Sequence, residues 1–156
     1  MKHTTFKQLL DACDSVRQIS DSFPELPAGM RSSHIHVLGT IYDIQAEQET
    51  CRVGEVSARM NVTAPGITRL INELYGLGML EKYPDETDKR ITLLRLTADG
   101  EQCVRRHILD FHQEWMDHLP DLTEEDALTA IRVIHRLQET MPYPRNKRKE
   151  FSSSWK

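Results

Sequence analysis

Apolar side chains recur every three to four residues in several stretches of the chain, and this spacing predicts amphipathic helices. The first stretch spans about residues 4–20. A proline-containing loop follows, and then Ser32 or Ser33 can cap a second helix that is apolar around most of its circumference. A helix without a polar face is buried on all sides, so we expect this one in the middle of the fold.

The next segment has the capping and turn residues of two short helices joined by a tight turn. Residues 54–60 form the first helix of the pair, and Thr63 is placed to cap the second, which carries a proline in its first turn. Gly76 and Gly78 are candidates for the C-cap of that second helix. This order predicts a helix-turn-helix over about residues 54–77.

A β-hairpin is predicted directly after the helix pair. Strands over residues 79–83 and 91–96 flank a polar loop, and residues 51–53 form a short extended piece before the pair. A helix-turn-helix followed by such a hairpin is a winged helix, which we place at about residues 51–97, with the wing at about 79–96. The expected fold class is mainly α with a small β-wing.

Two further helices follow the wing, one from Thr97 to about residue 118 and one that ends near Met141. Their apolar stripes, and that of the first helix, are too extensive for elements that flank so small a winged helix unless a partner covers them. We therefore predict that the segments at about 4–20 and 98–141 are dimerisation helices. The winged helix becomes the DNA-binding lobe between them.

Charge is distributed unevenly along the 156 residues, which carry 20 Lys and Arg against 24 Asp and Glu, a net of −4. This balance excludes a uniformly basic surface of the kind that coats nucleic acid. Residues 52–96 carry a net of +1, residues 97–141 a net of −6 and residues 142–156 a net of +4. A polyanion would therefore be tolerated only by the winged helix and the tail. The length suits a single domain, residues 1–141, followed by a basic C-terminal tail at 142–156.

Several classes of protein are disfavoured by features that the sequence lacks. No apolar stretch approaches the ~18–20 residues of a membrane span, and the N-terminus has no signal-peptide core, so we expect a cytoplasmic protein without membrane contact. The three cysteines share no CxxC spacing and form neither a disulfide nor a zinc framework. No glycine-rich phosphate loop or nucleophile elbow is present, so we expect no enzyme activity, no cofactor and no metal.

The second helix of the pair offers its N-terminal half to the major groove of DNA, because the opposite face of that helix holds its apolar positions. Arg69 can contact a guanine edge, Asn72 an adenine edge, and Thr68 a phosphate or a thymine methyl group. At the wing tip, Arg90 suits a narrow minor groove, whose negative potential attracts a guanidinium. The candidate DNA contacts from these two elements are Thr63, Ala64, Pro65, Gly66, Thr68, Arg69, Asn72, Lys82, Lys89 and Arg90.

Each of these charged or polar side chains, taken singly, is typical of a solvated surface. The ordered combination of a capped helix pair, a hairpin and a basic tip is much less frequent by chance, and it favours DNA binding. The alternative is a winged-helix module that binds another protein and does not bind DNA specifically. Such a module does not require two cations, Lys89 and Arg90, at the tip of a wing. It also does not require a neighbouring helix face that fits the major groove of DNA.

Residues 53–100 resemble the DNA-binding core of the MarR-type winged-helix transcriptional regulators. The most specific part runs from Asp88 to Gly100 and is similar to the wing signature D-x-R followed by L-T-x-x-G. The resemblance implies that Arg90 is the minor-groove residue and that Asp88 is the carboxylate that holds it in position. It covers nearly the whole chain. Residues 75–78 depart from the family pattern by an extra glycine, and the basic tail has no counterpart in it.

The resemblance further implies an obligate homodimer that regulates transcription, in the manner of a repressor. A twofold dimer meets two DNA half-sites about one helical turn (~34 Å) apart, so the double-stranded DNA operator should be a pseudo-palindrome. In this family, repression is typically relieved by a small molecule, a metal or an oxidant. We therefore expect an effector that acts between the dimer helices and the DNA-binding lobes.

The sequence favours a small-molecule effector over a metal or an oxidant. Glu114 and His118 at i,i+4 could share a metal, but an exposed pair on an acidic helix is the more frequent arrangement. A peroxide-sensing thiol needs a nearby cation, whereas Cys13 has acidic neighbours, so we expect Cys13 to serve packing. The candidate ligand-binding residues, around one cleft, are His34, His36, Phe111 and Trp115.

Overall fold

The structure is a computed structural model, and it describes residues 1–142, without the side chains of Arg17, Gln18 and Ser20. The predicted basic tail at 142–156 lies, from residue 143 onward, outside the described residues. The chain forms two compact units, residues 14–118 and residues 1–13 together with the segment that begins at Leu119.

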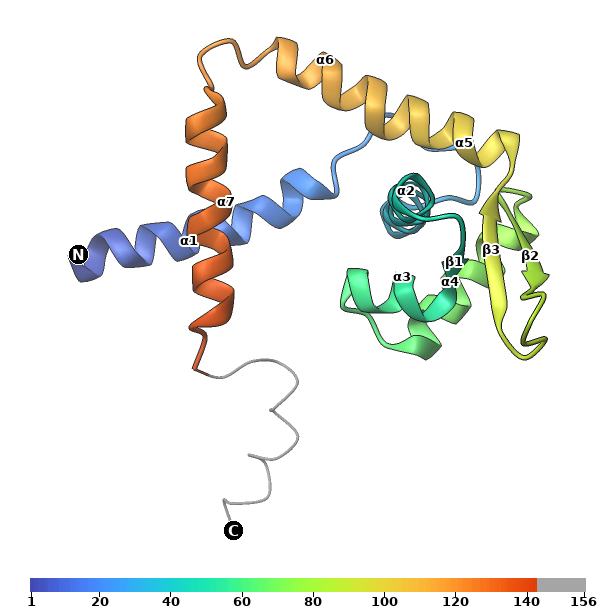
Figure 1. The fold of residues 1–156 in the computed structure, drawn as a ribbon. Coiled ribbons are helices and arrows are strands. Elements are labelled where there is room, and N and C mark those ends of the chain that lie inside the picture. Colours follow the sequence, from blue (N-terminus) through green and yellow to red (C-terminus); the bar gives the residue numbers. More distant parts are fainter. Residues whose placement is uncertain (143–156) are drawn as a thin grey trace. The chain divides into compact units, whose positions relative to one another are not determined.

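The unit of residues 14–118 contains all the elements of the predicted winged helix. The unit begins within α1 (His3–Ser20) and includes the last part of that helix. The elements that follow in chain order are α2 (Ser32–Glu47), β1 (Cys51–Arg52), α3 (Val53–Met60), α4 (Ala64–Gly76), β2 (Leu80–Pro84), β3 (Thr92–Leu96), α5 (Ala98–Val104), the π-helical η1 (Arg105–Asp110) and α6 (Phe111–Asp117). Figure 1 shows the helix pair α3–α4 and the hairpin β2–β3 side by side. The helix-turn-helix and the wing are therefore where the sequence pattern predicts them.

The sheet has three strands in the order β1-β3-β2, and both pairings are antiparallel. In the wing, Leu80 lies opposite Leu96 and Pro84 opposite Thr92. The short extended piece predicted before the helix pair is a third strand, in which Cys51 pairs with Leu94. This pairing fixes the start of α3 beside the middle of β3.

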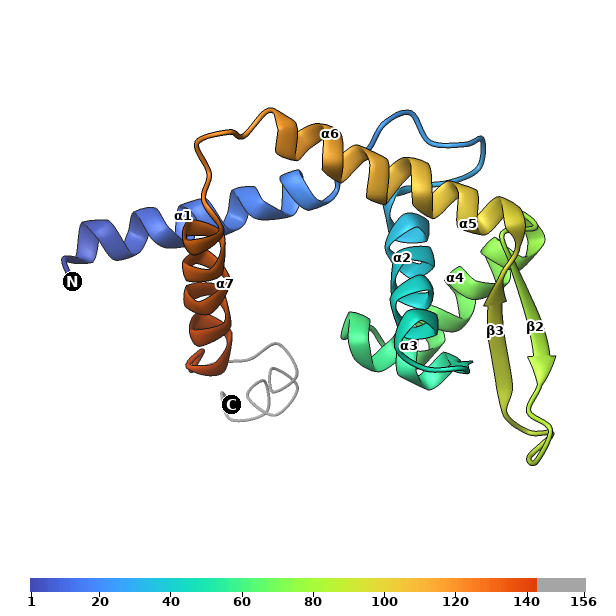
Figure 2. The same ribbon diagram turned by 45° about the horizontal axis from the view of Figure 1, so that its top comes forward.

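Helix α2 forms the centre of the core, as its nearly uniform apolarity predicts. Ile35, Leu38 and Ile41 are fully buried, and they are part of one cluster with residues of α3, α4, the sheet and α5. Figures 1 and 2 show α2 in the middle of this unit, between the helix pair and the helical run that begins with α5. A close approach is possible there because Gly39 has no side chain: a Cβ atom would lie 2.6 Å from Cδ1 of Ile108.

Two of the predicted helix caps need correction. The N-cap of α2 is Arg31 and not Ser32 or Ser33, because the backbone of Arg31 is extended and its N–H is bound by the ring of His34. Thr63 does occupy the N-cap position of α4, but its side chain makes no cap hydrogen bond. By contrast, the side chain of Thr97 does cap α5, the helix predicted to begin there, since its hydroxyl accepts the N–H of Gly100 at 3.1 Å.

The long helix predicted from Thr97 to about residue 118 contains a π-helical segment. Figure 2 shows α5 and α6 joined as one rod, and η1 occupies the six residues between them. A π-helical turn holds more residues than an α-helical turn, so it rotates the side chains that follow it. The predicted single apolar stripe is therefore interrupted: Val104 is buried, whereas Trp115 is 37% exposed.

The other unit contains the first part of α1 and the helix α7 (Glu124–Glu139). Thr123 caps α7 and forms a reciprocal capping box with Asp126. Apolar side chains of both helices are exposed, among them Leu10 at 44%, Leu128 at 52% and Ile131 at 49%. Among the helices of residues 1–142, none combines the length and the apolar character needed to cross a membrane.

Candidate nucleic-acid interface

Helix α4 divides into a buried and an exposed face, as expected for a recognition helix. Ile67, Ile71 and Leu74 are buried against the core. The candidate contacts lie on the other side, and all are exposed except Gly66, which is half-buried: Thr63, Ala64, Pro65, Gly66, Thr68, Arg69 and Asn72. The structure thus brings the predicted residues of α4 to one surface.

Gly66 is small for a reason that the sequence did not indicate. A Cβ atom at this position would lie 3.1 Å from Cγ1 of Val62, in the turn that precedes α4. The turn itself is held by the hydroxyl of Ser57, which donates to the backbone oxygen of Val62 at 2.7 Å. Gly66 therefore allows the turn to pack closely on the first turn of α4. This packing favours a glycine independently of any contact with a groove of DNA.

Thr68 and Asn72 both use a polar group inside the protein. The hydroxyl of Thr68 donates back along the helix to the Ala64 oxygen at 2.8 Å, which leaves its methyl group for contact with thymine. The carbonyl oxygen of Asn72 accepts from the ammonium of Lys82. In this position Asn72 does not present the free amide that the predicted contact with adenine requires, and Lys82 is turned towards α4.

Lys82 is a bridge between β2 and α4. In addition to its bond with Asn72, its ammonium lies 4.8 Å from the centre of the Tyr75 ring. The side chain of Lys82 is half-buried. Its first effect is thus to hold the wing strand against the recognition helix.

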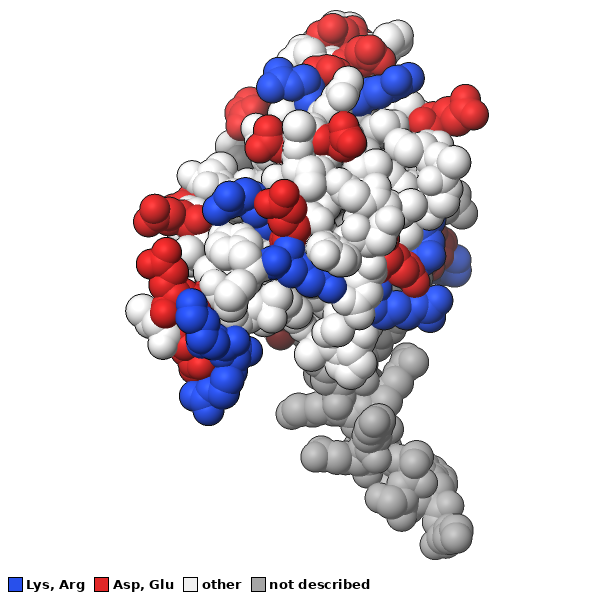
Figure 3. Space-filling model, turned by 90° about the vertical axis from the view of Figure 1, so that its right-hand side faces the viewer, with Lys and Arg blue, Asp and Glu red and all other residues white. Residues whose placement is uncertain are grey.

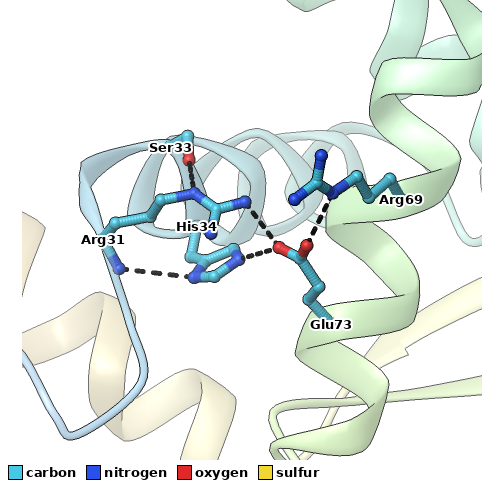
Figure 4. A network of polar contacts seen from close by, with 5 residues as sticks. All are labelled: Arg31, Ser33, His34, Arg69 and Glu73. Atoms are coloured by element: carbon cyan, nitrogen blue, oxygen red, sulfur yellow. Dashed lines mark hydrogen bonds and ion pairs between the residues drawn. The ribbon is translucent and has the colours of Figure 1, made fainter.

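Arg69 is the most accessible charged group of α4, with 77% of its side chain exposed. Its Nε donates to Oε1 of Glu73, one turn further along, at 2.9 Å. The other carboxylate oxygen of Glu73 accepts from Nη2 of Arg31 at 2.6 Å and lies 2.8 Å from Nε2 of His34 (Figure 4). Within residues 1–142 the structure shows no hydrogen bond from either terminal nitrogen of Arg69.

The carboxylate of Glu73 is strongly stabilised in its charged form. Its hydrogen bond with His34, followed by the bonds from Arg69 and Arg31, lowers the pKa of Glu73 to about 2. Sequence reasoning missed Glu73 as a member of the site. The spacing of four residues from Arg69 was the available signal.

At the wing tip, Asp88 holds the guanidinium of Arg90 by two hydrogen bonds of 3.0 Å each, from Nε and Nη2. Oδ1 of Asp88 also accepts the backbone N–H of Arg90 at 3.0 Å. These bonds from Arg90 lower the pKa of Asp88. The side chain of Arg90 is nevertheless 91% exposed, so a fixed guanidinium projects from the tip beside the exposed Lys89.

The loop behind the tip is shaped by Asp85. Its Oδ1 accepts the N–H and the hydroxyl of Thr87 at 2.8 and 2.6 Å and the N–H of Asp88 at 3.0 Å. The hydrogen bonds from Thr87, and then that from Asp88, lower the pKa of Asp85 to about 2. Asp85 is buried, so it fixes the turn from inside while Asp88 orients Arg90 outside.

Figure 3 shows the face that carries the sheet. Lys and Arg side chains form separate clusters on it, each with Asp or Glu beside it, and there is no continuous basic surface. This agrees with the net of +1 for residues 52–96. Contact with DNA would therefore depend on the placement of single exposed side chains such as Arg69 and Arg90.

A separate cleft of about 410 Å³ lies between α2 and the η1–α6 segment. His36, Phe111 and Trp115 line it, as predicted, together with Phe23 and His112. His36 is bound to Oδ1 of Asp21 at 3.2 Å. The rings of Phe111 and Trp115 lie 5.7 Å apart and form an aromatic part of the wall.

His34 does not belong to this cleft, and its predicted place there needs correction. Residues two apart on a helix point to different sides, and His34 is only 1% exposed, with its ring against Glu73. For the metal hypothesis, Nδ1 of His118 is bound to the backbone oxygen of Glu114 at 2.7 Å. Within residues 1–142, no group of three or more His, Cys, Asp or Glu side chains is placed to hold a metal ion.

The fold and this site define a winged helix-turn-helix protein. Residues 28–91, which extend from before α2 to the end of the wing loop, match the model described as "MarR family". This segment of the chain is therefore similar to the MarR family.

Known proteins extend the similarity beyond that segment. Over 87 residues the chain is 36% identical to the multiple antibiotic resistance protein MarR of Salmonella typhimurium. The aligned region covers 53% of this chain and 58% of that protein. The chain thus spans somewhat more than half the length of this curated relative.

Two solved structures have the same fold. One is the PcaV transcriptional regulator from Streptomyces coelicolor in complex with its natural ligand, with a TM-score of 0.60 and 21% identity over 87% of this chain and 90% of that one. The other is the complex of S. aureus MepR with DNA, with a TM-score of 0.62 and 16% identity over 89% of this chain and 97% of that one.

Proposed function

We propose that this protein is a sequence-specific DNA-binding transcriptional regulator, a ligand-responsive repressor that acts as a homodimer on a pseudo-palindromic operator. The observation that carries the proposal is the pairing of an exposed α4 face with a wing tip whose Arg90 is fixed by Asp88. Arg69 would contact a base edge in the major groove, and Arg90 would enter the neighbouring minor groove. The similar fold of MepR in its DNA complex supports this assignment.

The homodimer is supported by the exposed apolar residues of α1 and α7. Phe6, Leu10, Leu128 and Ile131 are each 36% to 52% exposed. Exposed apolar side chains of this kind are typical of an interface, and a second copy of the chain offers the same side chains. Two copies related by a twofold axis would present two α4 helices to half-sites about one helical turn (~34 Å) apart.

The effector would be a small molecule with an aromatic group, bound in the cleft between α2 and α6. Phe23, Phe111 and Trp115 supply apolar ring faces, while His36 and His112 supply polar atoms. A mostly apolar cleft with a few polar groups is the usual form of a small-molecule site. PcaV, a protein of similar fold, holds its natural ligand.

As a regulator of transcription, the protein would act in the cytoplasm and would have no catalytic role. The rival function, a winged-helix module that binds only proteins, is separated from this one by a DNA-binding titration. The predicted effect of Arg90→Ala is a loss of roughly 1–3 kcal/mol of binding free energy to a duplex enriched from a random pool. Fluorescence anisotropy at low salt measures it.

Arg132→Ala is the matched control, because it removes the same charge from α7, where Nη2 of Arg132 donates to the Thr129 hydroxyl at 3.0 Å. We expect this variant to bind as the wild type does. Equal affinities of Arg90→Ala and wild type would contradict the role of the wing. Absence of specific binding by the wild type would favour the protein-binding alternative.

A further inference from the structure

Glu73 is the meeting point of three side chains from two parts of the fold. Arg31 precedes α2, His34 lies in its first turn, and Arg69 lies one turn before Glu73 on α4 (Figure 4). The carboxylate uses Oε2 for Arg31 and His34 and Oε1 for Arg69. The recognition helix is therefore joined to the central helix by a polar contact as well as by apolar packing.

The ring of His34 forms the buried side of this network. His34 is 1% exposed, and both of its ring nitrogens are engaged: Nδ1 accepts the backbone N–H of Arg31 at 3.3 Å, and Nε2 faces Glu73 at 2.8 Å. These contacts correspond to the neutral ring with its hydrogen on Nε2. Glu73, whose side chain is 29% exposed, is thus held from the core side by a buried ring.

The outer side of the network acts on Arg69. A side chain that is 77% exposed has many rotamers of similar energy, and binding to DNA would have to select one of them. The bond from Nε to Glu73 restricts the guanidinium plane and leaves the two terminal nitrogens free to donate. Two parallel N–H groups are the donors that a guanine edge accepts.

We infer that Glu73 is a positioning residue for Arg69 and thereby sets the base specificity of the recognition helix. This inference rests on the proposed DNA-binding function. It also accounts for an acidic side chain on the helix proposed to face DNA: a carboxylate weakens the general attraction to DNA, and a gain in selectivity offsets that loss.

The substitution Glu73→Gln tests this with almost no change of shape. An amide has a single acceptor oxygen, whereas the carboxylate serves donors on both of its oxygens. The new NH2 group would face either Arg69 or the pair of Arg31 and His34. In both cases the link between the core and Arg69 is broken.

The experiment measures affinities by fluorescence anisotropy for the duplex enriched from a random pool, for its single base-pair variants and for an unrelated duplex. The proteins are wild type, Glu73→Gln, Arg69→Ala and the double variant, with Glu81→Gln as a control that removes an exposed carboxylate from β2. The position that Arg69 reads is the one at which Arg69→Ala loses discrimination. At that position we expect Glu73→Gln to lose about tenfold in discrimination.

Two further results are expected from the same titrations. Affinity for the unrelated duplex should stay equal or rise, because a negative charge is gone, and Glu73→Gln should have no further effect in the Arg69→Ala background. Glu73→Asp keeps the charge but is shorter, so it should lose discrimination without a gain on the unrelated duplex.

A purely structural role would give a different pattern. If Glu73→Gln weakened binding to all duplexes by one factor, or weakened it as much without Arg69, the inference would be overturned while the proposed function stood. If the wild type did not distinguish the enriched duplex from the unrelated one, the proposed function would fail, and the inference with it.

Discussion

Gly100→Ala should destabilise the winged helix, because Gly100 lies against the backbone at the base of the wing. A Cβ atom at this position would lie 2.0 Å from the carbonyl oxygen of Met79 and 3.1 Å from its carbonyl carbon. The same oxygen accepts the N–H of Thr97 at 3.2 Å, and the hydroxyl of Thr97 donates to the Gly78 oxygen at 2.7 Å. The backbone at Gly78 and Met79 cannot move aside without disturbing these hydrogen bonds with Thr97, which connect the start of β2 to the start of α5.

The magnitude follows from two opposing effects. Overpacking costs about 1–3 kcal/mol where flexible side chains give way, and here the obstacle is backbone, so about 3 kcal/mol or more is expected. Alanine regains up to about 1 kcal/mol of helix propensity in the first turn of α5. The net loss is about 2 kcal/mol or more, which lowers the Tm by about 4–8 °C for a chain of this length.

Thermal unfolding followed by circular dichroism measures this shift. Gly76→Ala is the matched control, because Gly76 ends α4 and a Cβ atom there meets nothing within 4 Å. We expect its Tm to remain the same or to rise by a few degrees, about 1 kcal/mol of propensity at most. A Gly100→Ala variant that melts at or above the wild-type temperature would refute the close approach of Met79 to Gly100.

Two further predictions concern the wing loop and the dimer. At neutral pH, Asp85→Asn should be less stable than the wild type. The pKa of Asp85 is lowered from 3.8 to about 2 in the fold, so this stability is present above pH 3.8 and is lost as the pH falls through about 2. Thermal melts at pH 7, 3 and 2 should show the gap between the two proteins closing, and a gap that stays constant would contradict the role of Asp85. Ile131→Glu places a charge on the exposed apolar face of α7 and should shift the sedimentation mass towards the 18.1 kDa monomer, whereas Arg132→Ala should not. A dimer that is equally stable in both variants would move the interface elsewhere.

The features that the sequence predicted correctly are those set by local spacing. The helix pair and the wing follow from apolar periodicity and turn residues within about 45 positions, and Thr97 caps α5 through a contact only three residues long. The contact between Asp88 and Arg90 joins neighbours two residues apart, so the family signature was sufficient to suggest it. Local chemistry explains these parts.

The features that the sequence did not predict depend on residues far apart in the chain. The bonds from Glu73 to Arg31 and to His34 cross 42 and 39 residues, and no periodic pattern records such a pairing. His34 was placed in the cleft because it is close to His36 in sequence, although helix geometry turns the two apart. The π-helical η1 was hidden because its sequence fits an α-helix equally well.

Selection of bound duplexes from a random pool tests the central claim most directly, namely that α4 and the wing read DNA sequence as a twofold pair. We predict enrichment of a pseudo-palindrome whose half-sites lie about one helical turn (~34 Å) apart. A pool that shows no enrichment over its input after successive rounds at low salt would contradict the claim.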